Sequence, residues 1–327
     1  MDSVATVQDL TFNAFVVEAT FLGDTAAFAL GDGTIRLVAG EAETRAEVHA
    51  GAILGAARSA DGRSLVTGGD DGLVAATDAA GAVTRIAERP RKWIDSVAAG
   101  AGGTVGFVTG RQVHVRFADG RERSLDLPRA AGGVAFAPKG TRLAIARYDG
   151  VTLWWPATEA APAALEWKGA HLAASFSPDG RYVVTAMQDN ALHGWRLGDG
   201  KDMRMSGYPS KPRSMSWSAK GRFLATSGAN AAILWPFHHK DGPMGKPPLQ
   251  LGAREVLVTR VACHPRDDMV AVAYQDGMIL AVRFADAEEA LLRRPGGSPA
   301  SALGWDDAGR RLAFGTEGGD GGIVGVA

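Results

Sequence analysis

Histidines, a single cysteine and regularly spaced aspartates are the residues of this 327-residue sequence that could do chemistry. His238 and His239 are adjacent, but with only Asp241 nearby they fall short of a closed metal site. His114 and His193 lie in apolar segments and could bind a small ligand, although a structural role is the interpretation that we prefer. The sequence therefore predicts no metal and no cofactor.

Cys263 ends a short apolar segment, at the place where equivalent segments carry Phe or Trp. A free cysteine in such a place behaves as a small hydrophobic side chain, so we predict buried packing rather than reactivity. His264 follows it in a predicted turn, where a surface position is expected.

Aspartates recur once per repeat of the pattern described below. A ring of these carboxylates could surround a central metal or substrate. The preferred interpretation is that each aspartate caps its own turn by accepting hydrogen bonds from backbone N–H groups, because this explains their period. The residues are Asp32, Asp71, Asp149, Asp189 and Asp276.

Basic residues are concentrated in the linkers between repeats, well above the average set by 35 Lys and Arg in 327 residues. One interpretation is a basic face that binds an acidic protein or peptide, with Trp93 and its two basic neighbours at the centre. The alternative is that these bases pair with the turn aspartates on the same face. The candidate residues are Arg91, Lys92, Trp93, Arg129, Lys168, Lys211, Arg213, Arg254, Arg293 and Arg294.

The elements that must position these residues repeat about every 37–47 residues, a spacing typical of propeller blades. The clearest copy, residues 172–200, holds an apolar segment, the turn SPDGR, a second apolar segment, the turn QDN and a third segment that ends at Trp195. Short apolar runs bounded by Asp-Gly or Asn turns predict antiparallel strands. Only residues 286–292 could form a turn or two of helix.

We therefore predict one all-β domain over residues 1–327, a propeller of eight four-stranded blades, with seven as the alternative. The last unit ends after its third strand, while residues 4–12 form a spare apolar segment. Because an unpaired blade edge invites aggregation, residues 1–12 are expected to supply the closing strand of the last blade.

The pattern of turns, apolar strands and Trp resembles the repeat of the WD-repeat β-propeller family. Trp155, Trp195 and Trp235 stand at the family's tryptophan position, although none is followed by Asp. In that family a His, a Ser or Thr, an Asp and the Trp often form a bonded group within a blade. Here the spacing retains only parts of it: His49, Thr67 and Asp71 in the second unit, and Thr185, Asp189 and Trp195, without the His, in the fifth.

The resemblance implies a scaffold or adaptor that binds proteins or peptides. The sequence also lacks the G-x-S-x-G, H-E-x-x-H, P-loop and G-x-G-x-x-G motifs, so we predict that the protein is not an enzyme. The alternative is an enzyme or small-ligand binder that uses the central funnel, with His114 or His193 contributing.

The composition limits the partners and the cellular compartment that we expect for this protein. A formal net charge of −1 argues against nucleic-acid binding. One cysteine excludes an intramolecular disulfide and fits a reducing compartment. Because no apolar run is long enough to span a membrane and no secretory signal is present, we expect a soluble, cytoplasmic monomer that makes no contact with membranes.

Overall fold

The computed structural model describes residues 7–326, which are almost entirely β-strand. Among these residues there is one 3₁₀ turn, η1, which spans Ala101–Gly103. Residues 289–292 of the segment with helical potential instead belong to the strand β27, because they complete an antiparallel sheet. No helix within residues 7–326 has the length and apolar character that crossing a membrane requires.

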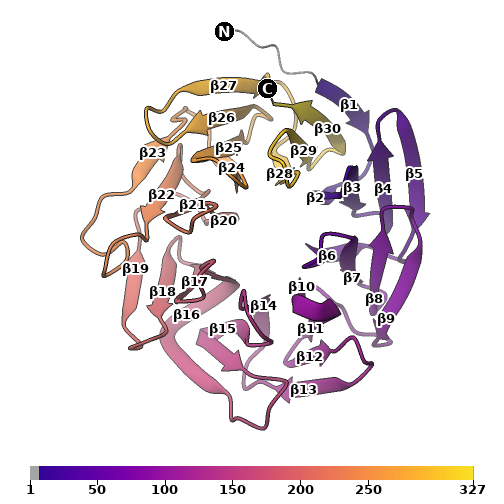
Figure 1. Ribbon diagram of the computed structural model, residues 1–327, viewed down its shortest axis with the longest axis vertical. Helices are drawn as coiled ribbons and strands as arrows, with labels where there is room; N and C mark the ends of the chain where they lie inside the picture. Colours follow the sequence, from indigo (N-terminus) through magenta and orange to yellow (C-terminus); the bar gives the residue numbers. More distant parts are fainter. Residues whose placement is uncertain (1–6, 327) are drawn as a thin grey trace. The chain divides into compact units, whose positions relative to one another are not determined.

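The chain divides into two compact units, residues 1–30 with 207–327 and residues 31–206. In the first unit, β20–β23, β24–β27 and β28–β30 form successive sheets, and β2 pairs with β3 (Figure 1). Its strands are β1 (Val7–Thr11), β2 (Val16–Leu22), β3 (Thr25–Leu30), β20 (Met215–Trp217), β21 (Phe223–Thr226), β22 (Ala232–Pro236), β23 (Leu249–Leu251), β24 (Val258–Cys263), β25 (Met269–Tyr274), β26 (Ile279–Arg283), β27 (Glu289–Arg293), β28 (Ala300–Trp305), β29 (Arg311–Thr316) and β30 (Asp320–Gly325).

In the second unit, β4 pairs with β5, and the sheets β6–β9, β10–β13 and β14–β19 follow in chain order. Its strands are β4 (Thr34–Ala39), β5 (Ala42–Glu47), β6 (Ile53–Arg58), β7 (Ser64–Gly69), β8 (Leu73–Asp78), β9 (Val83–Glu88), β10 (Val97–Ala99), β11 (Val105–Thr109), β12 (Gln112–Arg116), β13 (Glu122–Asp126), β14 (Ala131–Phe136), β15 (Leu143–Trp154), β16 (Ala163–Phe176), β17 (Tyr182–Met187), β18 (Leu192–Arg196) and β19 (Asp202–Met205).

Strand pairing within residues 7–326 gives seven antiparallel sheets, six with four strands and one with six. Small antiparallel sheets that follow one another along the chain are the architecture of a β-propeller, so the predicted fold class is confirmed. The predicted eight separate four-stranded sheets are not observed; the number of sheets matches the alternative of seven.

The difference arises in the six-stranded sheet, where the sequence predicts two units. The segment expected to be a linker, 167–171, stays extended inside β16. The first half of β16 therefore pairs with β15, with Ala163 opposite Leu153, and its second half pairs with β17, with His171 opposite Met187.

The N-terminal strand β1 pairs antiparallel with β30, from Val7 opposite Val324 to Thr11 opposite Asp320. Phe12, directly after β1, is only 5% exposed, and its ring lies 4.8 Å from that of Phe28. The fourth strand of the last sheet thus comes from the other end of the chain. Residues 4–6 of the predicted strand lie outside the described residues.

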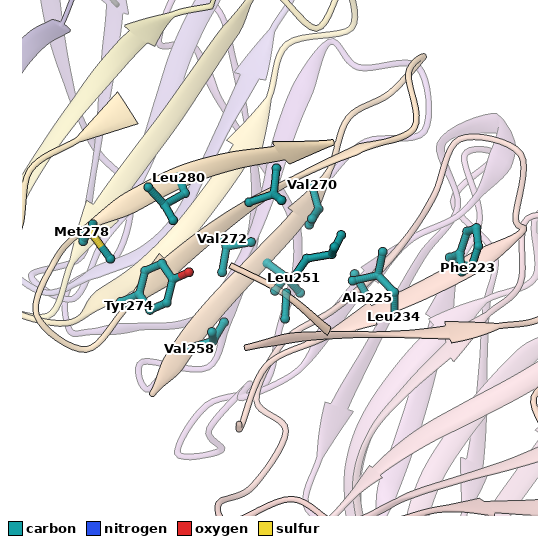
Figure 2. Packing of buried hydrophobic residues seen from close by; sticks show 13 residues of the cluster. Phe223, Ala225, Leu234, Leu251, Val258, Val270, Val272, Tyr274, Met278 and Leu280 are labelled. Atoms are coloured by element: carbon teal, nitrogen blue, oxygen red, sulfur yellow. The ribbon is translucent and has the colours of Figure 1, made fainter. Parts of the chain in front are cut away.

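Side chains of the second strands are buried on both faces, which is why these strands read as continuous apolar runs. Val270, Val272 and Tyr274 of β25 pack toward the sheet β20–β23 in one 13-residue cluster, most of which Figure 2 labels. The intervening Ala271 and Ala273 pack toward β28–β30. Because successive side chains of a strand point to opposite faces, one strand contributes to the contacts with both neighbouring sheets.

Candidate functional site

The partial WD-type group that the sequence predicts in the second repeat is assembled in the structure. His49 Nε2 lies 2.9 Å from Thr67 Oγ1, and His49 Nδ1 lies 3.0 Å from Asp71 Oδ1. Burial acts to raise the pKa of Asp71, but hydrogen bonds from His49 and from two backbone N–H groups outweigh burial and lower the pKa. The group connects a linker, a second strand and the turn that follows it.

Replacing Thr67 by Val is expected to lower the free energy of unfolding by about 1–3 kcal/mol, because His49 would lose a buried partner. Thr84→Val, at an exposed position of β9, is the matched control. Urea denaturation measures both changes, and a Thr67→Val variant as stable as the control would contradict the role of the group.

Asp71 gives this group a defined pH dependence. Because folding lowers the pKa of Asp71, its stabilising effect is fully present above the unfolded value of about 3.8 and is lost as pH falls through the folded value. The stability difference between the natural protein and Asp71→Asn should therefore shrink below about pH 4. A difference that stays constant down to pH 2 would contradict this assignment.

The fifth sequence repeat was predicted to lack the histidine of the bonded group, and this prediction is wrong. Buried His171 lies 2.7 Å from Thr185 Oγ1, and its Nε2 donates to the carbonyl of Trp167 at 3.1 Å. Its ring is 5.6 Å from the ring of Trp195. The expected spacing did not identify this histidine. The linker that would carry it is part of the extended β16, so fewer residues separate His171 from Thr185 than the repeat predicts. Asp189 pairs instead with Arg204 at 3.2 Å.

In the repeat over residues 208–251, a tyrosine occupies the position that His49 and His171 have in the other two repeats. Tyr208 Oη lies 2.6 Å from Thr226 Oγ1 and accepts a hydrogen bond from Trp235 Nε1 at 2.6 Å. Burial raises the pKa of Tyr208 to about 12, so the phenol stays neutral. Three repeats therefore connect their strands by hydrogen bonds between different sets of residues.

The two histidines suggested for a funnel site have structural surroundings. His114 lies 3.0 Å from Thr109 Oγ1 and 2.8 Å from Ser124 Oγ. His193 stacks on Trp167, with 3.9 Å between ring centroids, and burial lowers its pKa to about 4. His114 of β12 thus contacts β13, His193 of β18 contacts β16, and neither belongs to the lining of the cavities described below.

The remaining histidines and the cysteine also have structural contacts. His264 is buried rather than at the surface, because it lies 2.9 Å from the carbonyl oxygen of Gly309 and packs on Trp305. Cys263 Sγ donates to the carbonyl oxygen of Ser216, and burial raises the pKa of this thiol to about 12. The rings of His238 and His239 lie 4.1 Å apart in a tilted arrangement, and residues 7–326 contain no group of three or more His, Cys, Asp or Glu side chains that could hold a metal.

The recurring aspartates make local hydrogen bonds. Asp32 accepts from the N–H and the hydroxyl of Thr34, and Asp276 accepts from the N–H of Met278, as expected for turn caps. Asp149 instead accepts from the N–H of Gly169, across to β16.

The ten predicted basic-face residues differ in their local surroundings. Arg254 pairs with Glu289, while Arg293 donates to the carbonyl of Gly277 and lies over the ring of Phe314. Arg129, Lys168 and Arg294 are exposed in loops or at a strand bend. Within the described part of the chain, none of the ten residues forms an ion pair with a turn aspartate, so the proposed pairing is not observed.

Arg91, Lys92 and Trp93 line an open groove of about 760 Å³ in the second unit. Trp93 is 69% exposed, whereas the next residue, Ile94, is fully buried and fixes the loop on the sheet. Arg91 has a positive φ of 63°, and Lys92 N donates to the carbonyl of Arg89 at 3.0 Å, so the loop turns tightly. Arg111, Gln112, Asp95 and Asp126 also contribute to the lining of the groove.

Lys211 and Arg213 belong to the first unit and line a cavity of about 280 Å³ at the linker end of its strands. A second cavity, of about 380 Å³, lies along the first strands β2, β24 and β28 and shares Arg213 and Arg260 with the first cavity. Glu18 also lines this second cavity, and burial raises its pKa to about 7.

Sequence reasoning missed Glu18 and Arg260. The available signal was a charged residue inside an otherwise apolar first strand, VVEATFL for Glu18 and VTRVAC for Arg260. A charge in such a strand is costly unless it faces a polar cavity.

Comparison with known proteins identifies the fold alone. No protein-family model matches the chain, and no curated protein resembles it in sequence. Among solved structures, the computationally designed Ika8 protein is similar, with a TM-score of 0.76 and 17% sequence identity. The similarity covers 97% of this chain and 98% of that chain.

Proposed function

We propose that this protein is a non-enzymatic propeller scaffold that binds an acidic segment of a protein partner in the groove formed by Arg91, Lys92 and Trp93. The observation that carries the proposal is an indole that is 69% exposed beside two cations. Among residues 7–326, neither Arg91 nor Lys92 has a carboxylate within ion-pair distance.

Hydrogen bonds and ring contacts with neighbouring strands hold the loop that carries these side chains. Buried Ile94 donates its N–H to the carbonyl of Gly69, and Arg89 pairs with Glu122 while lying over the ring of Phe107. A loop fixed in this way loses little conformational entropy on binding. Trp and Arg are enriched among the residues that contribute most to protein interfaces, and clustered positive charge favours an acidic partner.

A photo-crosslinking amino acid at position 112, inside the groove, tests the proposal in cell extract. The crosslinked proteins should share acidic segments, and the crosslinks should disappear in the double variant Arg91→Glu, Lys92→Glu. The melting temperature should stay nearly unchanged, because both side chains are exposed.

The matched control is Arg63→Glu with Lys139→Glu, two exposed positions in turns at the other end of their strands, which should leave the crosslinks intact. Crosslinks that persist after reversal at positions 91 and 92 would overturn the proposal. An identical set of crosslinked proteins from a probe at position 139 would do the same.

We extend the proposal to the finer architecture. β15 and β16 contain Gly150 and Gly169, with φ of 127° and 106°. If each long strand is divided there, the six-stranded sheet holds two sets of four strand segments and would act as two blades of a degenerate WD-type propeller. The bonded groups around His49 and His171 support this reading. The single cysteine and the neutral composition support a monomer in the cytoplasm.

A further inference from the structure

The first unit contains a charged cavity that the proposed scaffold function does not use. Two cavities, of about 280 and 380 Å³, share Arg213 and Arg260. Their charged lining consists of Lys211, Arg213 and Arg260 together with Glu18 and Glu317. The lining therefore contains three basic side chains and only two carboxyl groups, those of Glu18 and Glu317.

Arg260 is held in place by the backbone rather than by a carboxylate. Its Nε donates to the carbonyl of Ser301 at 2.5 Å, and its Nη1 donates to the carbonyl of Thr259 at 3.1 Å. Among residues 7–326, no carboxylate lies within ion-pair distance of Arg260, Arg213 or Lys211. A largely buried guanidinium that forms no ion pair is costly, and a bound anion would supply a partner at ion-pair distance.

Arg213 and Arg260 line both cavities, and the positive charge of Arg213 disfavours the charged form of Arg260. Burial lowers the pKa of Arg260, the carboxyl groups of Glu18 and Glu317 oppose this shift, and the charge of Arg213 adds to it. An anion between the two would relieve this repulsion. Planar guanidinium groups bind carboxylate and phosphate oxygens in pairs, which suits an oxyanion better than a halide.

We propose that these two cavities bind one small oxyanion, a carboxylate or a phosphate group, between the guanidinium groups of Arg213 and Arg260. Two serine hydroxyls fix the segments that line the cavities: Ser214 Oγ, in the linker beside Arg213, donates to the carbonyl of Val261 at 3.2 Å, and Ser301 Oγ of β28 donates to that of Val16 at 2.6 Å. Arg260 therefore projects from the strand β24, and the linker that carries Arg213 is held against this strand by Ser214.

Glu18 would make the binding depend on pH. Its carboxyl faces the same cavity as both arginines, and its pKa of about 7 lies near neutrality. Below pH 7 the neutral carboxyl does not repel an anion, whereas above pH 7 the carboxylate competes for the guanidinium groups. Affinity should therefore fall as pH rises, by up to about tenfold per pH unit above 7.

Isothermal titration calorimetry of the full-length protein in chloride buffer tests the proposal with two probes. Sulfate, which keeps its charge between pH 6 and 8, represents a phosphate group, and succinate represents a carboxylate ligand. At least one probe should bind with one-to-one stoichiometry at millimolar concentration or below. The stronger probe identifies the class of ligand.

Arg213→Gln, at an exposed position on the rim, should weaken binding by about tenfold or more without lowering the melting temperature. Glu18→Gln should retain binding and abolish its change between pH 6 and 8. Arg63→Gln, in the second unit, is the control and should bind as the natural protein does. Failure of both probes to bind, or full affinity in Arg213→Gln, would overturn the proposal.

Discussion

Deletion of residues 1–12 is expected to give a protein that melts at a much lower temperature and aggregates. The deletion removes β1, whose five residues pair with β30, and exposes the edge of β30. It also removes Phe12, which packs on Phe28 and donates its backbone N–H to the carbonyl of Gly319. Loss of a buried Phe alone costs about 3–5 kcal/mol, and an open strand edge adds the risk of intermolecular pairing.

Thermal unfolding and size-exclusion chromatography measure the two effects. Phe12→Ala separates them, because it removes the packing but keeps β1, and it should lower stability without causing aggregation. Deletion of residues 1–6 leaves all of β1 in place and serves as the control. A monomeric 1–12 deletion with the melting temperature of the natural protein would show that β1 is dispensable.

Replacing Trp195 by Ala is expected to lower the free energy of unfolding by about 3–5 kcal/mol. Trp195 is 2% exposed and packs with Leu153, Phe176 and Val183 in one core cluster. Its removal would leave a large cavity beside the His171–Thr185 contact. At the equivalent position Trp235 is only half-buried, so its replacement should cost less.

Trp93→Ala is the matched control, because it removes the same side chain from a position that is 69% exposed. Its unfolding free energy should stay within about 0.5 kcal/mol of the natural value. Urea denaturation compares the variants directly. Equal stability of Trp195→Ala and Trp93→Ala would show that the tryptophan at the end of the third strand has no structural role.

The sequence alone determined the local structure. Asp-Gly and Asn turns between short apolar runs predicted the strands, because a turn with positive φ and an apolar run are both encoded over a few residues. Together they predicted the all-β propeller class. The final unit, which lacks a fourth strand, pointed to the N-terminal segment, and β1 does pair with β30.

Tertiary structure decided which distant residues meet. His171 and Tyr208 occupy equivalent bonded positions that spacing could not reveal, because an extended linker and a change of residue type broke the pattern. Only the tertiary structure shows which cavity a linker base lines: Arg91 and Lys92 line the groove beside Trp93, and Arg213 lines the two cavities that it shares with Arg260. Glu18 and Arg260 are 242 positions apart in the chain, and only packing of β2, β28 and β24 against one another brings them to one cavity.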